Sequence, residues 1–212
     1  MTHAQRFPRG LYGITPDTTH FEALHEAVTS AALGGMKTLQ WRQKQLSPTL
    51  SHRHALAMAQ LCRQLGVVFI INDDVDLAIA VGADGVHLGK DDGSARHARE
   101  RLGPGKIIGR SCYNEIERAK TAIADGVDYV AFGTVFTSSV KPDAVRAPLA
   151  LFAQVRSLFN DQPPVALVAI GGITADNASQ VVSAGADSLA VIGGLFDQPD
   201  VRATAARFAA LF

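Results

Sequence analysis

Two carboxylates that each follow a short apolar run could share a divalent cation. Asp73 follows the run at residues 69–71 after a single asparagine, Asn72, and Asp92 comes shortly after the run VHL at residues 86–88. Oxygen ligands from two adjacent loops suit Mg²⁺, which keeps several waters while it bridges phosphates. Asp91 is an equal candidate for the second ligand, because the spacing alone does not separate it from Asp92.

A set of cations follows other apolar runs. Gln40, Arg42 and Lys44 alternate in the segment QWRQK at residues 40–44, so their side chains share one face if the strand conformation continues. Lys141 ends the segment TSSVK at residues 137–141. Lysine and arginine suit the charge of a phosphate group. We therefore expect phosphate beside these cations, with a solvated loop as the alternative for QWRQK.

Two glycine pairs, at residues 171–172 and 193–194, follow the last two apolar runs of the chain. When such strands close into a barrel, exposed backbone N–H groups at these positions form the usual phosphate site. Each pair alone could be a tight turn. Together with the acids and the cations, the pairs indicate two phosphorylated substrates, or one substrate with phosphate at both ends.

Several neighbouring polar residues have simpler structural interpretations. Asp74 and Asp76 suit the first turn of the next helix, where acidic side chains are favoured. His87 is more simply a packed histidine than a catalyst, Ser111 could be only a helix cap, and Cys112 could be a small apolar filler.

Short apolar runs, each followed by a stretch of helical spacing, are the elements that would position these residues. Several runs follow a glycine, such as Gly66 or Gly126, that would close the preceding helix in the left-handed conformation. The predicted strands are residues 11–15, 38–41, 67–71, 85–88, 106–109, 129–132, 165–170 and 188–192.

The alternation of strands and helices implies a parallel sheet with right-handed crossovers. Eight such units predict an α/β fold, a (β/α)8 TIM barrel, in one domain over residues 1–212. An open doubly wound sheet is the alternative, but it would place a glycine-rich turn after the first strand, where GITPD has none. In a barrel, the polar residues that follow the strands gather on one rim.

The composition excludes several classes of protein. The chain is 47% hydrophobic, and its 20 basic and 20 acidic residues give a net charge of zero, so we expect no general affinity for nucleic acid or anionic membrane. Neither a signal peptide nor a membrane-spanning run is evident. Cys62 and Cys112 lack metal-ligand spacing, so we expect reduced thiols in a cytoplasmic protein. A homo-oligomer is compatible with the sequence.

In motif order the chain resembles the thiamine-phosphate synthase family over essentially its full length. The segments that carry the resemblance are LYGITPD, LQWRQK, INDDVDLAIAVGADGVHLGKDD, GRSCYN, YVAFGTVFTSSVKPDA and AIGGITADNASQVVSAGADSLAVIGGLF. The resemblance implies a (β/α)8 barrel that joins hydroxymethylpyrimidine diphosphate to thiazole phosphate. The products would be thiamine phosphate and pyrophosphate, and Mg²⁺ would be the cofactor.

The resemblance also implies roles for individual residues. Asp73 and Asp92 would bind Mg²⁺, and Lys44, Ser111 and Lys141 would take part in catalysis. The residues implied in substrate binding are Gln40, Trp41, Arg42, Gln43, Lys44, Asn72, Ser111, Ser138, Ser139, Val140, Lys141, Gly172, Ile192 and Gly193.

The chain departs from the family pattern in the segment TSSVK. The family usually has threonine, any residue, threonine and lysine where this chain has Ser138, Ser139, Val140 and Lys141. Val140 removes one hydroxyl, so contact with the thiazole phosphate there would come from the backbone or from Ser139. Thr137 also replaces the usual proline.

Two other functions fit parts of the pattern. A thiazole tautomerase, an isomerase of similar fold, would need neither metal nor diphosphate-binding cations. It is expected to carry a histidine two positions after Ser111, where this chain has Tyr113. A non-catalytic binder of thiazole phosphate is the alternative from a different class. It would show no Mg²⁺-dependent binding of the pyrimidine diphosphate.

Overall fold

The computed structural model describes residues 6–137 and 145–212. Its strands are β1 (Gly10–Ile14), β2 (Thr38–Trp41), β3 (Val68–Asn72), β4 (Gly85–Leu88), β5 (Ile107–Tyr113), β6 (Tyr129–Gly133), β7 (Ala166–Ile170) and β8 (Ser188–Val191). Its helices are α1 (Phe21–Leu33), α2 (Pro48–Leu65), α3 (Val75–Ala80), α4 (Ala95–Leu102), α5 (Ile116–Ala124), α6 (Ala150–Ser157), α7 (Ala178–Ser183), α8 (Gly193–Phe196) and α9 (Val201–Ala209).

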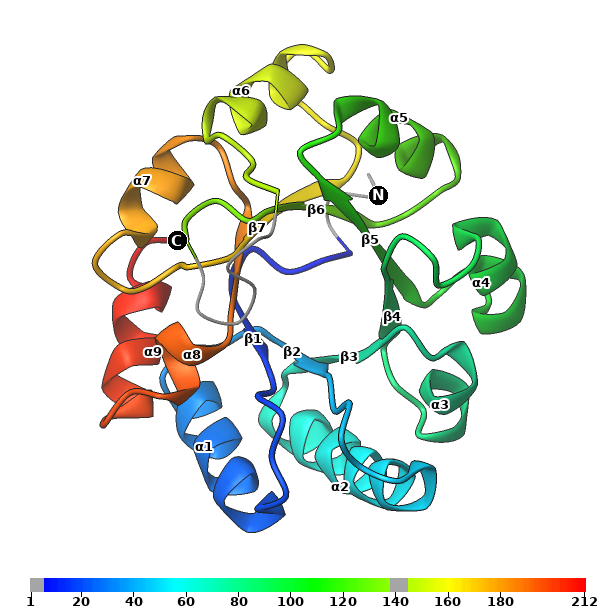
Figure 1. The fold of residues 1–212 in the computed structure, drawn as a ribbon, viewed down its shortest axis with the longest axis vertical. Coiled ribbons are helices and arrows are strands. Elements are labelled where there is room, and N and C mark those ends of the chain that lie inside the picture. The colour runs from blue at the N-terminus through cyan, green and yellow to red at the C-terminus, as the bar shows by residue number, and fades with distance from the viewer. Residues whose placement is uncertain (1–5, 138–144) are drawn as a thin grey trace.

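The strands form a closed parallel barrel in chain order. Each strand pairs in parallel with the next, and β8 pairs with β1 through Ser188 opposite Gly10 and Val191 opposite Gly13. Figure 1 shows the strands as an inner ring with the helices outside it. The predicted (β/α)8 barrel is therefore confirmed, because an open doubly wound sheet would leave β1 and β8 unpaired with each other.

The predicted strand bounds agree best with the observed bounds where polar residues clearly limit the apolar run. β2 and β4 have the predicted bounds, whereas β5 runs on from the predicted end at residue 109 to Tyr113. Arg110 and Ser111 therefore lie within the strand and not in the loop after it. The pairing of β5 with β6 is irregular between Ser111 and Tyr113.

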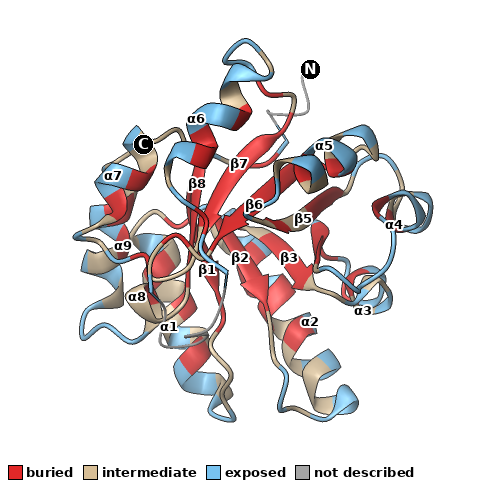
Figure 2. Ribbon diagram, turned by 45° about the horizontal axis from the view of Figure 1, so that its top comes forward, coloured by how far each residue is buried: buried red, intermediate tan, exposed pale blue. Residues whose placement is uncertain are grey.

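Apolar side chains are buried on both faces of the strands. One cluster, which includes Ile70 and Val168, fills the barrel interior, and a larger one, which includes Leu39 and Leu189, lies between strands and helices. Figure 2 shows the ring of strands buried and the outer sides of the helices exposed. This two-sided burial explains why the strands are continuous apolar runs and not alternating ones.

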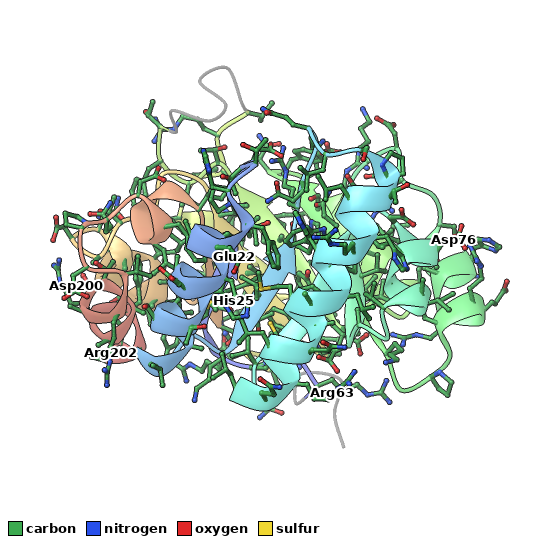
Figure 3. All side chains as sticks on the ribbon, turned by 90° about the horizontal axis from the view of Figure 1, so that it is seen from below. Glu22, His25, Arg63, Asp76, Asp200 and Arg202 are labelled. Atoms are coloured by element: carbon green, nitrogen blue, oxygen red, sulfur yellow. The ribbon has the colours of Figure 1, made fainter. Side chains whose placement is uncertain are left out.

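The helices turn their polar side chains outward. In α1, Leu24, Val28 and Ala31 are buried, while Glu22 is exposed. Figure 3 shows Glu22 on α1 and Arg63 on α2 at the outer surface. In the described part of the chain, no helix combines the length and the apolar character needed to cross a membrane.

A repeated Gly-x-Asp turn leads into β4, β6 and β8. Gly82, Gly126 and Gly185 have φ of 66°, 81° and 107°, which glycine adopts at little cost. The aspartate that follows accepts a hydrogen bond from the backbone of the preceding strand. Asp128 Oδ2, for example, accepts from the Ile108 N–H at 2.8 Å. These carboxylates tie neighbouring strands together at the end of the barrel opposite the predicted site.

Candidate active site

The two predicted metal ligands lie against each other at the carboxyl ends of β3 and β4. Asp73 directly follows β3, and its carboxyl group lies beside that of Asp92, because a Cβ added to Gly89 would meet Asp92 Oδ2 at 2.5 Å and Asp73 Oδ1 at 3.8 Å. Burial, followed by the neighbouring carboxyl group of Asp92, raises the pKa of Asp73 to about 6, although Lys44 and Asn72 act in the opposite direction. Two carboxylates this close repel each other, so a proton or a cation between them is favoured.

Backbone geometry aims Asp73 at this position. Its φ is 64°, in the left-handed region that residues other than glycine adopt at a cost, and its N–H donates to the His87 carbonyl at 2.8 Å. The Asn72 side-chain amide donates to Asp73 Oδ2 at 2.5 Å. Strained backbone of this kind is concentrated at functional sites.

Neighbouring acids have the structural roles predicted for them. Asp74 caps α3, because its Oδ1 accepts from the Leu77 N–H at 2.8 Å. Asp76 forms an exposed ion pair with Arg101. Neither acid takes part in the contact between Asp73 and Asp92.

The structure separates Asp92 from Asp91 as partner of Asp73. Asp92 Oδ2 accepts from the Gly89 N–H at 2.9 Å, and this turn directs its side chain toward Asp73. The guanidinium of Arg110 donates to the Gly93 carbonyl at 2.7 Å and to the Lys90 carbonyl at 3.2 Å, which orders the same loop.

The donor set fits a hard cation that is shared with a substrate. Among the described residues, no group of three or more histidine, cysteine, aspartate and glutamate side chains could hold a metal ion. Mg²⁺ uses one or two carboxylates and completes its shell with waters and phosphate oxygens. A pair of acids is therefore a suitable protein contribution.

The segment after β2 is held by the loop after β1. Arg42 Nη1 lies 3.3 Å from Asp17 Oδ2, and the Lys44 N–H donates to Asp17 Oδ1 at 2.5 Å. The charge of Lys44 also acts on Asp73, whose pKa it lowers. Asp17 was missed by the sequence analysis, although it too follows the end of a strand.

The side chains of Gln40, Trp41 and Gln43 in the segment QWRQK have different surroundings. Trp41 is buried between β2 and α2, where its Nε1 donates to Ser51 Oγ at 3.3 Å. The Gln43 amide donates to the Pro16 carbonyl at 2.6 Å, and its Oε1 accepts from the Thr18 N–H. These side chains brace the rim, whereas Gln40 is buried inside the barrel.

Hydrogen bonds across the barrel interior connect two predicted substrate-binding residues. Gln40 Nε2 donates to Tyr12 Oη at 2.6 Å, and Tyr12 Oη lies 2.8 Å from Tyr129 Oη. His87 Nδ1 lies 2.9 Å from Tyr129 Oη, and its Nε2 lies 2.8 Å from Ser111 Oγ. His87 is therefore packed, as predicted, but is also linked to Ser111.

Both tyrosines of this chain of hydrogen bonds were missed by the sequence analysis. Tyr12 and Tyr129 lie within apolar runs, where they could be read as core residues. The only available signal was that a buried tyrosine hydroxyl needs a hydrogen-bond partner.

The two glycine pairs lie side by side on the same rim. A Cβ added to Gly194 would lie 2.1 Å from the Ile173 carbonyl oxygen, and one added to Gly172 would lie 2.4 Å from the Thr137 carbonyl oxygen. The loops after β6, β7 and β8 can therefore approach this closely only with glycine. Gly193 begins α8, and the preceding Ile192 packs partly buried against the barrel interior.

The remaining predicted residues lie outside the described ranges. They are Ser138, Ser139, Val140 and Lys141. Just before them, Thr137 Oγ1 accepts from Arg146 Nη1 at 3.0 Å.

An open hollow of about 570 Å³ lies elsewhere, between α5 and α6. Its lining includes Glu115, Glu117 and Leu151, and no lysine or arginine of the described ranges belongs to it. It therefore lacks the cations that a phosphorylated substrate requires, and the rim remains the better candidate site.

Comparison with known proteins gives consistent matches over the whole barrel. A family model described as thiamine monophosphate synthase matches residues 11–195. A thiamine-phosphate synthase of Bordetella pertussis is 53% identical over 209 residues, 98% of this chain and 96% of the relative. One of Aromatoleum aromaticum is 52% identical over 204 residues, 96% of each chain. The solved thiamine phosphate pyrophosphorylase from Pyrococcus furiosus has a TM-score of 0.84 and 33% identity, and the match covers 98% of this chain and 96% of that one.

Proposed function

This chain belongs to the thiamine monophosphate synthase family, whose members are transferases, and from that membership we propose its reaction and the residues that perform it. The proposed reaction joins hydroxymethylpyrimidine diphosphate to thiazole phosphate and yields thiamine phosphate and pyrophosphate. The observation that carries the assignment is the contact between Asp73 and Asp92, beside Lys44, on the rim that also bears the glycine pairs.

Asp73 and Asp92 would hold Mg²⁺ through carboxylate oxygens. Asn72 orients Asp73 by its hydrogen bond, and Gly89 orients Asp92. When bound, Mg²⁺ would neutralise part of the negative charge of the diphosphate. The raised pKa of Asp73 supports this role, because a cation relieves the repulsion that otherwise favours a proton.

Arg42 and Lys44 would bind the diphosphate and stabilise the charge that grows on it as the C–O bond breaks. Asp17 fixes Arg42 through an ion pair and the Lys44 backbone through a hydrogen bond, so both residues are positioned before substrate arrives. Lys141 would act on the same group. Preorganised charges of this kind contribute a few kcal/mol each in a site that excludes water.

The bond-breaking step would leave positive charge on the exocyclic carbon of the pyrimidine, which the thiazole nitrogen then captures. Gly172 and Gly193 would hold the distant thiazole phosphate through backbone N–H groups, with Ser138, Ser139 and Ile192 beside it. Holding the phosphate orients the nitrogen toward the carbon, which lowers the entropic part of the barrier. Such a reaction needs no strong general base.

The role of His87 agrees with that chemistry. Burial, with the charge of Arg110, lowers the pKa of His87 to about 4, although Asp92 acts in the opposite direction. The imidazole is therefore neutral at physiological pH. Both of its nitrogens have partners inside the barrel, so it orients other groups and is not free to take a substrate proton.

A turnover assay with both substrates tests the function. The expected result is one pyrophosphate released for each thiamine phosphate formed, with release abolished when a chelator removes Mg²⁺ or when thiazole phosphate is omitted. Isomerisation of a thiazole phosphate without pyrophosphate release would instead indicate a tautomerase. Binding of thiazole phosphate without any turnover would indicate a non-catalytic binder.

A further inference from the structure

A continuous chain of hydrogen bonds crosses the barrel interior between two residues of the proposed pyrimidine site. Four contacts of 2.6 to 2.9 Å join Gln40 to Ser111 through Tyr12, Tyr129 and His87. The five side chains come from β2, β1, β6, β4 and β5 in that order. We call these five residues the relay.

The relay is shielded from water along most of its length. Tyr12, Gln40, Tyr129 and His87 are buried. The ring of Phe7 packs against the rings of Tyr129 and Tyr12, with centroid distances of 4.1 Å and 5.3 Å. A Cβ at Gly109 would lie 1.9 Å from the Tyr129 ring, so this position must be glycine for the ring to fit.

The direction of hydrogen bonding within the relay follows from its first member. Gln40 Nε2 donates to Tyr12 Oη, so the Tyr12 proton is directed to Tyr129. Tyr129 then donates to His87 Nδ1, because that nitrogen is the acceptor left within the relay for the Tyr129 hydroxyl proton.

The need of each donor for an acceptor also determines the direction of the hydrogen bond between His87 and Ser111. A neutral imidazole has one donor and one acceptor, so His87 with an acceptor at Nδ1 must carry its proton on Nε2 and donate to Ser111 Oγ. Among the described residues, the Ser111 proton then has no acceptor and can be donated to a ligand, and Gln40 Oε1 has no donor and can accept from one. In this direction, every hydroxyl and imidazole proton of the relay except that of Ser111 has an acceptor within the relay.

We propose that the relay fixes the hydrogen-bond polarity of the pyrimidine site, with Gln40 Oε1 as acceptor and the Ser111 hydroxyl as donor. This makes Tyr12, Tyr129 and His87 positioning residues that act through Gln40 and Ser111. The identity of the ligand rests on the proposed function. The hydrogen-bond polarity, in contrast, is a property of the protein without ligand.

The polarity selects one class of substrate. An aminopyrimidine offers an exocyclic N–H to an acceptor and a ring nitrogen to a donor. The corresponding oxopyrimidine offers a carbonyl and a ring N–H, which is the reverse pattern. A site with fixed donors and acceptors discriminates strongly against a ligand that leaves its buried polar groups unpaired.

The direct test is the tautomer of His87 in the ¹⁵N-labelled full-length protein, read from long-range ¹H–¹⁵N spectra and assigned with His87→Gln. The wild-type protein should show a single tautomer protonated at Nε2. In Gln40→Met, which removes the donor at the far end, either direction makes the same number of hydrogen bonds. The Nδ1-protonated form should then rise to a substantial fraction, although Gln40 does not touch His87.

Gln43→Met is the matched control, because Gln43 lies in the same segment, but its side chain bonds, within the described part of the chain, only to the loop after β1. It should leave the tautomer unchanged. A wild-type His87 protonated at Nδ1, or a His87 tautomer that is the same in Gln40→Met as in wild type, would overturn the relay. Neither result depends on turnover, so failure of the relay is distinguishable from failure of the proposed reaction.

Substrate choice is the second readout. Tyr129→Phe breaks the relay at its centre and touches neither phosphate site. The preference in kcat/KM for aminopyrimidine diphosphate over its oxo analogue should fall at least about tenfold, while the KM for thiazole phosphate stays unchanged. Tyr12→Phe serves the same purpose if Tyr129→Phe does not fold. An unchanged preference in a folded variant would contradict the positioning role.

Discussion

At the scale of single residues, Asp73 and Asp74 show how adjacent carboxylates take different roles. Asp73 has φ of 64° and turns into the rim, whereas Asp74 is extended and caps α3. The sequence predicted both roles, because an acid after a buried strand and an acid before a helix have different uses. It could not choose between Asp91 and Asp92, since that choice depends on a turn in which the Gly89 N–H binds Asp92.

Binding of Mg²⁺ should depend on pH through Asp73. Its pKa is raised to about 6 in the folded protein, so below that value the carboxyl group is protonated and a cation must displace the proton. The apparent affinity should therefore fall about tenfold for each pH unit below 6 and level off above it. Calorimetric titration of Mg²⁺ from pH 5 to pH 8 measures this, and an affinity that is flat across pH 6 would contradict it.

The same raised pKa has a consequence for stability without metal. The folded protein holds a proton on Asp73 that the unfolded chain releases at lower pH, so this group stabilises the fold at low pH. That contribution is lost as the pH rises through about 6. In Asp73→Asn, which cannot ionise, the free energy of unfolding should lack this decline, as urea titrations at pH 5 and pH 7.5 would show.

The two cysteines should be unreactive in the folded protein. Cys62 and Cys112 are buried free thiols, and burial raises the pKa of each to about 12. Because only the thiolate reacts, a thiol reagent at pH 8 should label neither until denaturant is added. Stoichiometric labelling of the native protein within minutes would show that one of these side chains is accessible.

At the scale of the elements, the Gly-x-Asp turns explain how the even-numbered strands are anchored. Asp84, Asp128 and Asp187 each accept from the backbone N–H of the preceding strand. Asp128 also pairs with Arg99 at 2.6 Å, and Asp187 pairs with Arg156 at 2.5 Å. The glycines were predicted from the sequence as helix ends, but the role of the aspartates was not, because it depends on which strands become neighbours.

Asp128→Ala should therefore be strongly destabilising. Its carboxylate is fully buried, and its removal leaves the Ile108 N–H and Arg99 without that partner. We expect a loss of about 3 kcal/mol in the free energy of unfolding, measured by urea denaturation. Asp176→Ala removes a far more exposed ion pair with Arg207 and should cost less than about 0.5 kcal/mol. Equal losses in the two variants would contradict the anchoring role.

The C-terminal bound of β5 was predicted too early from the sequence. The predicted strand ended at residue 109 because polar residues follow, yet the strand continues to Tyr113. The polar residues belong to the strand because Ser111 faces the barrel interior and Arg110 faces the loop after β4. Near the mouth of a barrel, the inner face can be polar, so loss of apolar character does not mark the end of a strand.

At the scale of the whole molecule, the number and order of the elements were sufficient to predict the barrel. Eight strands alternating with helices close in chain order, which brings Asp73, Lys44 and Gly193 to one rim from distant parts of the chain. The interior relay could not be predicted. Its contacts join residues up to 117 positions apart and depend on the register of every intervening strand.

The central claim is that Asp73 and Asp92 share a divalent cation that assists departure of the diphosphate. Pyrophosphate release with both substrates and saturating Mg²⁺, compared between Asp73→Asn and Asp74→Asn, tests it most directly. Asparagine tolerates the left-handed conformation at position 73 and still caps a helix at position 74, so both variants should fold.

The account predicts release at about the wild-type rate for Asp74→Asn and at least about 100-fold slower release for Asp73→Asn. Release by a folded Asp73→Asn protein within about threefold of the wild-type rate would contradict the claim.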